Sequence, residues 1–186
     1  MKLEDAIRKR RSVKKFSTDK PNWRKIISAI DLARISPSAG NLFVMRFILV
    51  RDEEKIKKIA EATQQPFVGS VNYIVVAVSD DSKLVRSFGN RGIRYASLQA
   101  GAAIENLLLA LTDAGLVTTW VGHFYDEQIK DVLNIPDNLN IEGVFPIGKE
   151  TKIKTVEKPK AELDNILYFD KWENKKMNAE TITMTK

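Results

Sequence analysis

The apolar and polar positions of this chain alternate with two different periods, which predicts helices and strands in mixed order. Apolar side chains recur every three or four residues over 23–36 and 52–64, so we expect an amphipathic helix in each range. Shorter runs of β-branched and aromatic residues predict strands at 46–50, 73–78, 117–121 and 141–147. The run at 73–78 is too short for a helix and predicts a central strand.

Turn and capping residues indicate where the elements end. A short helix is expected to end near Arg10, with extended chain after it as far as Pro21. The loop Pro37-Ser38-Ala39-Gly40-Asn41 ends the helix over 23–36, and Pro136 stops a short helix over 126–133.

The segment 96–111 predicts a helix that is apolar on almost every face. Its polar exceptions are Ser97, Gln99, Glu105 and Asn106. Such a helix must be buried all round, either in a core or in a subunit interface. The small residues at 100–103 would let another backbone approach closely, and Gly115 is a fitting C-cap.

The composition changes beyond Gly148, where the chain becomes Lys-rich and irregular. One apolar patch, at 166–169 with Trp172, has too little contiguous apolar surface to fold alone. We therefore expect one folded domain over 1–160 and a C-terminal extension over 161–186. The extension is expected to lie along a neighbouring surface, either of its own subunit or of a partner.

Composition excludes several kinds of chemistry. The 186 residues suit one domain, and 44% hydrophobic with 29% charged residues argues against wholesale disorder. The absence of cysteine excludes disulfides, thiolate zinc sites, iron–sulfur clusters and a cysteine nucleophile. His123 is the single histidine, so no metal site is expected. Redox or group-transfer chemistry here would depend on an organic cofactor.

A basic run near the N-terminus is the first candidate binding site. Arg10, Arg11 and Ser12 are followed by Lys14, and arginine forks with a hydroxyl suit a phosphate group. Taken alone, such a run is more often a solvated basic face. A nucleic-acid patch is a third possibility, although no aromatic side chain is interleaved with the run before Phe16, and the formal charge of +6 does not decide between them. No apolar run reaches the length of a membrane span and no signal segment opens the chain, so a cytoplasmic protein is expected.

Short motifs follow one another in a fixed order along the chain. They are Arg10-Arg11-Ser12-Val13-Lys14 with Phe16, Ser36-Pro37-Ser38-Ala39-Gly40-Asn41, Glu105-Asn106-Leu107-Leu108-Leu109-Ala110 in the small-residue helix, Gly115-Leu116 leading to Trp120-Val121-Gly122 and Phe124, and Phe145-Pro146-Ile147-Gly148. In this order and spacing the chain resembles the FMN-dependent nitroreductase family over roughly residues 3–170.

The resemblance implies an α+β fold, with an antiparallel-rich mixed sheet flanked by helices in a three-layer sandwich. It also implies an intertwined homodimer with FMN sites at the interface, and an extension that packs on the partner subunit. Arg10, Arg11 and Ser12 would hold the FMN phosphate and ribityl chain, and Lys14 would approach the pyrimidine end of the ring. A cation there stabilises the negative charge of the reduced flavin.

Further cofactor contacts follow from the same resemblance. Pro37, Ser38 and Asn41 would reach the ring from the other subunit. The backbone of Val121, Gly122 and His123 would face the flavin, with a main-chain N–H near N5. Lys160 stands where the family often has an arginine for the phosphate, and Lys158 is the alternative.

Two departures from the family pattern make the expected pocket less polar. Phe43-Val44-Met45 replaces the Gln-Pro-Trp that many members carry after the loop asparagine, and Gly122 stands where some members have a glutamate.

The expected function is hydride transfer from NADH or NADPH, through flavin N5, to a nitroaromatic, quinone or similar conjugated acceptor. No side chain is needed as a nucleophile, because the flavin carries the chemistry. Two alternatives stay open: a dehalogenating or flavin-fragmenting reaction of the same family, and a non-catalytic basic module that binds nucleic acid.

Overall fold

A computed structural model describes residues 1–151 and 161–177 of the chain. The chain divides into two compact units, Met1–Ile153 and Lys154–Lys186, which are described separately.

The first unit is built on a three-stranded antiparallel sheet in the order β1-β2-β3. The strands are β1 (Met45–Val50), β2 (Tyr73–Ser79) and β3 (Asn140–Ile147). Phe47 lies opposite Ala77, and Val75 lies opposite Phe145. Every residue of β2 is buried, which confirms the prediction of a central strand.

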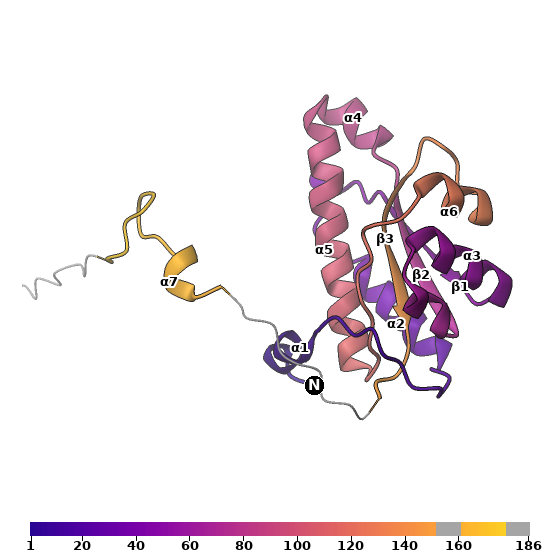
Figure 1. Cartoon of the computed structure of the whole chain (residues 1–186). Helices are drawn as coiled ribbons and strands as arrows, with labels where there is room; N and C mark the ends of the chain where they lie inside the picture. The colour runs from indigo at the N-terminus through magenta and orange to yellow at the C-terminus, as the bar shows by residue number, and fades with distance from the viewer. Residues whose placement is uncertain (152–160, 178–186) are drawn as a thin grey trace, which may run out of the picture. The chain divides into compact units, whose positions relative to one another are not determined.

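Helices cover both faces of the sheet, and the side chains of β2 alternate between them. Tyr73, Val75 and Ala77 pack with α2 (Trp23–Ala33) and α5 (Arg91–Asp113). The intervening residues of β2 pack with α3 (Glu53–Thr63) and α6 (Asp126–Leu133). Figure 1 shows the sheet between α5 on one side and α3 and α6 on the other. The predicted α+β three-layer arrangement is confirmed.

The predicted helices are present, with some different ends. Helix α1 (Leu3–Lys9) ends next to Arg10, its C-cap, as expected, and α6 has the predicted bounds. Helix α2 stops three residues before the predicted Ser36. Helix α5 begins five residues before the predicted Ala96 and ends in a Schellman turn, in which Leu116 N–H donates to Leu111 O over 2.9 Å. The short elements α4 (Ser82–Phe88), η1 (Ala39–Asn41) and η2 (Pro66–Ser70) were not predicted.

The strand predicted at 117–121 is interrupted. Val117 and Gly148 exchange both backbone hydrogen bonds, and so do Val121 and Val144. The register places Thr119 opposite Pro146 between these pairs, and proline has no N–H to donate. The segment therefore lies along β3 as an extended chain joined by two separate bridges.

Helix α5 is not buried all round within this chain. Ile104, Leu107 and Leu111 are fully buried against the sheet, whereas Ile93 is 54% and Leu98 60% exposed. The helix therefore has one covered face and one apolar face that the described chain leaves open.

The second unit contains the short helix α7 (Leu163–Ile166) and a turn. The rings of Tyr168 and Trp172 lie 4.7 Å apart, and Lys175 lies over the Tyr168 ring. Leu163, Ile166 and Trp172 remain largely exposed. The packing of this extension on a partner stays a prediction.

Helices α4 and α5 cross at Gly92, and the crossing leaves no space for a side chain. A Cβ at Gly92 would lie 2.4 Å from the carbonyl group of Leu84. We predict that Gly92→Ala destabilises the protein by about 1–3 kcal/mol or more, because the obstructing atoms are backbone. The melting temperature should fall by several degrees, whereas Ser97→Ala, an exposed change in the same helix, should leave it nearly unchanged. An unaltered melting temperature for Gly92→Ala would contradict the crossing.

Candidate functional site

The basic run after α1 lies beside the interrupted strand. Val13 is 1% exposed and donates its N–H to Thr118 O over 3.0 Å, and Ser12 forms a parallel bridge with Thr118. These contacts place Arg10, Arg11 and Ser12 next to the segment that leads to Val121. Two of the predicted groups of cofactor residues therefore come together in one chain.

Arg10 and Arg11 line a cavity of about 300 Å³ between the basic run and the end of α5. The Nε atom of Arg10 lies 3.4 Å from Oε1 of Glu105, and Arg11 forms an ion pair with Glu150. Arg8, by contrast, pairs with Glu4 on the exposed side of α1. The two arginines thus converge on a concave site, where an anion would compete with the two carboxylates.

Lys14 lies near an aromatic side chain that the sequence did not single out. Its Nζ is 5.2 Å from the centre of the Phe67 ring in η2. The lysine remains exposed, so its charge is available at this surface.

The backbone at 121–123 offers two candidate donors rather than three. Val121 donates its N–H to Val144 O over 3.0 Å and is therefore occupied. Gly122 and His123 are exposed, and their N–H groups make no hydrogen bond within residues 1–151 and 161–177. A ring facing this segment would receive its hydrogen bonds from Gly122 or His123.

The chain directly after the loop at 37–41 is held to α5 by one buried amide. Gln99 is 3% exposed, its Oε1 accepts from Val44 N–H over 2.7 Å, and its Nε2 donates to Leu42 O over 3.0 Å. By sequence, Gln99 is only a polar exception on this apolar helix. An amide on the buried face of an apolar helix was the signal that could have revealed this role.

A second cavity, of about 250 Å³, lies between this loop and α5. It is lined by Pro37, Ser38, Ala39, Tyr95, Leu98, Gln99 and Ala102. Asn41 is exposed and has a φ of 57°, in the left-handed region that asparagine tolerates. Phe43 packs on the main core, and Val44 is buried with Leu84 and Ala96, so these departures from the family pattern have a packing role.

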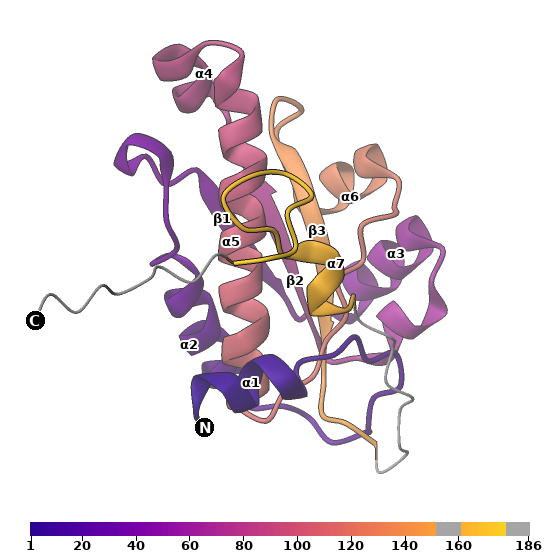
Figure 2. The same ribbon diagram turned by 90° about the vertical axis from the view of Figure 1, so that its left-hand side faces the viewer.

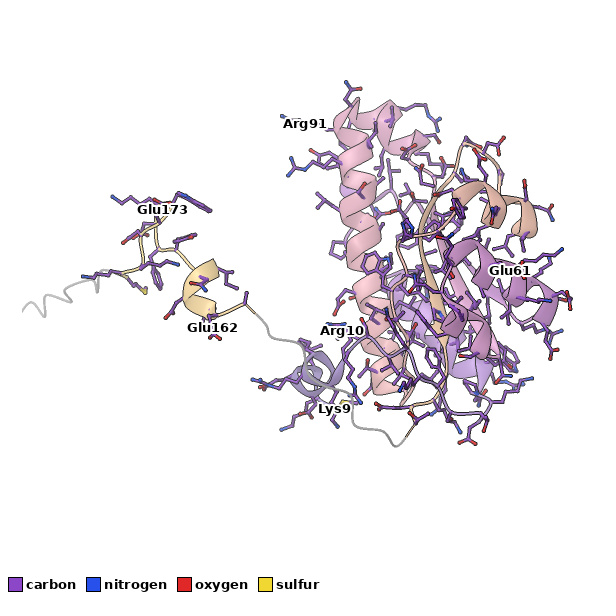
Figure 3. The ribbon with its side chains drawn as sticks, in the orientation of Figure 1. Lys9, Arg10, Glu61, Arg91, Glu162 and Glu173 are labelled. Atoms are coloured by element: carbon purple, nitrogen blue, oxygen red, sulfur yellow. The ribbon has the colours of Figure 1, made fainter. Side chains whose placement is uncertain are left out.

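The loop and the basic run do not meet within one chain. The loop lies beside α5 residues 98–102 and the basic run beside 105–112, about 13 Å apart along the helix axis. In Figure 2, α1 lies near one end of α5 and α4 near the other, and Figure 3 shows Arg10 and Arg91 toward these two ends. The predicted residues Lys158 and Lys160 lie outside the described residues.

The described chain contains a further cavity, but neither a metal-ligand cluster nor a membrane-spanning helix. A larger cavity, of about 810 Å³, lies between α3 and η2, and none of the predicted cofactor residues lines it. Within the described ranges no cluster of three or more potential metal ligands occurs. No helix in this part of the chain is long and apolar enough to span a membrane.

Comparison with known proteins finds one matching family model and several similar proteins. A family model described as Nitroreductase family matches residues 7–70 and 62–149. A protein of Archaeoglobus fulgidus, provisionally named an NADH dehydrogenase/NAD(P)H nitroreductase, is 31% identical over 75% of this chain and 80% of its own length.

Two solved structures are similar in fold. A nitroreductase family protein from Clostridium novyi NT is 30% identical in sequence. Its superposition covers 94% of this chain and 96% of that chain, with a TM-score of 0.74. An iodotyrosine deiodinase solved with FMN and 3-iodo-L-tyrosine is 21% identical in sequence. Its superposition covers 90% of this chain and 100% of that chain, with a TM-score of 0.77.

Replacing the buried amide tests how the loop is anchored. Gln99→Met keeps the side-chain length but leaves Val44 N–H and Leu42 O unpaired, at a cost of about 1–3 kcal/mol for each group. We predict a lower urea midpoint and faster proteolysis in the loop. Gln128→Met makes the same chemical change at an exposed position and should alter neither measurement. Equal urea midpoints and equal proteolysis rates for the two variants would show that Gln99 does not anchor the loop.

Proposed function

The chain belongs to the nitroreductase family, and from this membership we propose that it is an FMN-dependent oxidoreductase. It would transfer hydride from NADH or NADPH to a nitroaromatic, quinone or similar conjugated acceptor. The observation that carries the proposal is the convergence of Arg10 and Arg11 on a cavity that Val117 and Thr118 also line, at the start of the segment that continues to the exposed residues Gly122 and His123.

The residues present fit the parts of FMN. Two guanidinium groups at one cavity match a phosphate monoester, which arginine binds through paired hydrogen bonds. The Ser12 hydroxyl is exposed beside them and can add a directed bond. The N–H groups of Gly122 and His123 match the polar edge of a flavin ring. Bound there, FMN would accept hydride from the nicotinamide and pass electrons to the acceptor.

The protein's own contribution is binding and electrostatics. Arg10 and Arg11 would exchange Glu105 and Glu150 for the phosphate, so the carboxylates keep the arginines positioned before the cofactor binds. Lys14 would supply positive potential on the side of the ring where reduction places negative charge. A nucleic-acid site has less support, because Arg10 and Arg11 line one concave cavity instead of following an exposed surface.

A second copy of the chain would complete the site. Within one chain, the loop with Pro37, Ser38 and Asn41 is separated from the basic run along α5. We therefore propose a homodimer in which the open face of α5 packs on the partner and brings the partner's loop to the ring. The extension over 161–186, with its exposed apolar side chains, would pack on the same partner.

Removing one arginine should weaken FMN binding without affecting riboflavin. Arg11→Ala loses a charge-assisted contact and leaves Glu150 facing the phosphate, so FMN affinity should fall about ten- to a hundredfold. Riboflavin has no phosphate and should bind the variant and the parent equally. Arg8→Ala removes an arginine outside the cavity and serves as the control for fluorescence titration. Unchanged FMN affinity in Arg11→Ala would show that this cavity does not bind the FMN phosphate.

A bulky residue on the open face of α5 tests the dimer. A Cβ at Gly101 meets no atom within 4 Å in this chain, so Gly101→Trp should fold normally as a single chain. We predict that it separates the subunits and releases flavin, as measured by sedimentation and absorbance, with retained far-UV circular dichroism. Lys58→Trp on the exposed side of α3 should stay dimeric. A flavin-loaded monomer in either variant would contradict the interface site.

A further inference from the structure

A basic stretch lies at the corner between α4 and α5, outside the residues assigned to the cofactor. Between Asp81 and Glu105 the chain contains Lys83, Arg86, Arg91 and Arg94 and no carboxylate. All of these cations are exposed. Across residues 1–151 and 161–177, none of them forms an ion pair with a carboxylate.

Arg86 differs from the two arginines of α5 because it has a negative neighbour. Hydrogen bonds from the side chain and backbone of Ser82 lower the pKa of Asp80, and the charges of Arg46 and Arg86 lower it further. Asp80 is therefore ionised at neutral pH and offsets part of the charge of Arg86. Of the remaining cations of this stretch, Lys83 lies on α4, whereas Arg91 and Arg94 lie together in the first turn of α5.

These two arginines precede, on α5, the residues that line the cavity at the loop 37–41. Arg94 precedes Tyr95 in the sequence and lies one helical turn before Leu98, and both of these residues line the cavity. Arg91 lies one further turn away, on the same side of α5. The cavity therefore has an apolar wall, formed by Leu98 and Ala102, and the two arginines precede this wall along α5.

The corner and the loop are packed as one unit. The rings of Phe88 and Tyr95 form an edge-to-face pair 5.3 Å apart. A Cβ at Gly40 would lie 3.0 Å from the Phe88 ring, so the aromatic pair contacts the loop directly. The backbone of α5 at Arg94, next to Tyr95, is thus packed against the loop that contains Ser38, which we have assigned to the flavin ring.

We propose that Arg94, assisted by Arg91, binds an anionic group on the electron acceptor, so that the preferred acceptors are aromatic or conjugated acids. The inference rests on the proposed function, since the acceptor must reach the ring beside Ser38. The apolar wall contacts the planar body of the acceptor, and a guanidinium fork pairs with its carboxylate, sulfonate or phosphate. This recognition determines which acceptor binds and leaves the electron transfer to the flavin.

Two acceptors of nearly equal shape test the proposal: 4-nitrobenzoate is an anion, and 4-nitrobenzamide is neutral. In the first two-electron step NAD(P)H supplies a hydride and the solvent a proton, one N–O bond breaks, and the products are the nitroso compound, water and NAD(P)+. The ratio of kcat/KM for the two compounds is measured on the FMN-loaded protein and on the Arg91→Gln/Arg94→Gln variant. We expect the variant to lower this ratio about tenfold, mainly through the KM for nitrobenzoate.

Controls separate this inference from its alternatives. Arg51→Gln removes an exposed cation at the other cavity and should leave the ratio unchanged. An unchanged ratio in the double variant overturns the proposal. A changed preference for NADPH over NADH with an unchanged acceptor ratio also overturns it, because the arginines would then bind the donor's phosphate. A protein without bound flavin contradicts the proposed function and the acceptor site with it, whereas a loaded, reducible variant with the parental ratio contradicts the acceptor site alone.

Discussion

The burial of α5 on only one face is the constraint on which the rest of the structure depends. Its inner side packs on the central sheet through fully buried Ile104, Leu107 and Leu111, while Leu98 on its outer side stays 60% exposed. Exposed apolar area on a helix of this length favours a partner surface. At Gly101 the outer side also has open space where another backbone can approach.

The candidate site is attached to the same helix at separate points. Gln99 holds the loop that contains Ser38, and Glu105 holds Arg10 of the basic run. The Gln99 attachment lies on the buried side of α5 and the Glu105 attachment on its partly exposed side, and neither closes a complete pocket within one chain. A dimer formed across the outer side of α5 would join the two halves, so assembly and cofactor binding would depend on one another.

The sequence predicted those parts of the fold whose conformation depends on neighbouring residues in the chain. Local periodicity and helix-breaking residues predict the central strand, α1 and α6. The position of Gly115 at the end of α5 follows from the preference of helix C-termini for glycine. The interruption of the strand at 117–121 depends on Pro146, a distant residue whose missing N–H matters only in the final register. Likewise the pairing of Arg11 with Glu150 and the anchoring by Gln99 join residues far apart in the chain, which no local pattern indicates. The residues of the basic run and the loop were recognised through their motifs, but the separation along α5 required the structure.

Mixed dimers test most directly whether the flavin site is shared between two copies. One chain carries Arg10→Ala and Arg11→Ala, the other carries Ser38→Tyr, and each variant alone should lose FMN. If the site takes the basic run from one copy and the loop from the other, the co-expressed mixed dimer regains one intact site and binds half the flavin of the parent. If each chain forms its own site, the mixed dimer contains no intact site, and absorbance at the flavin band that stays as low as in the separate variants would contradict the account.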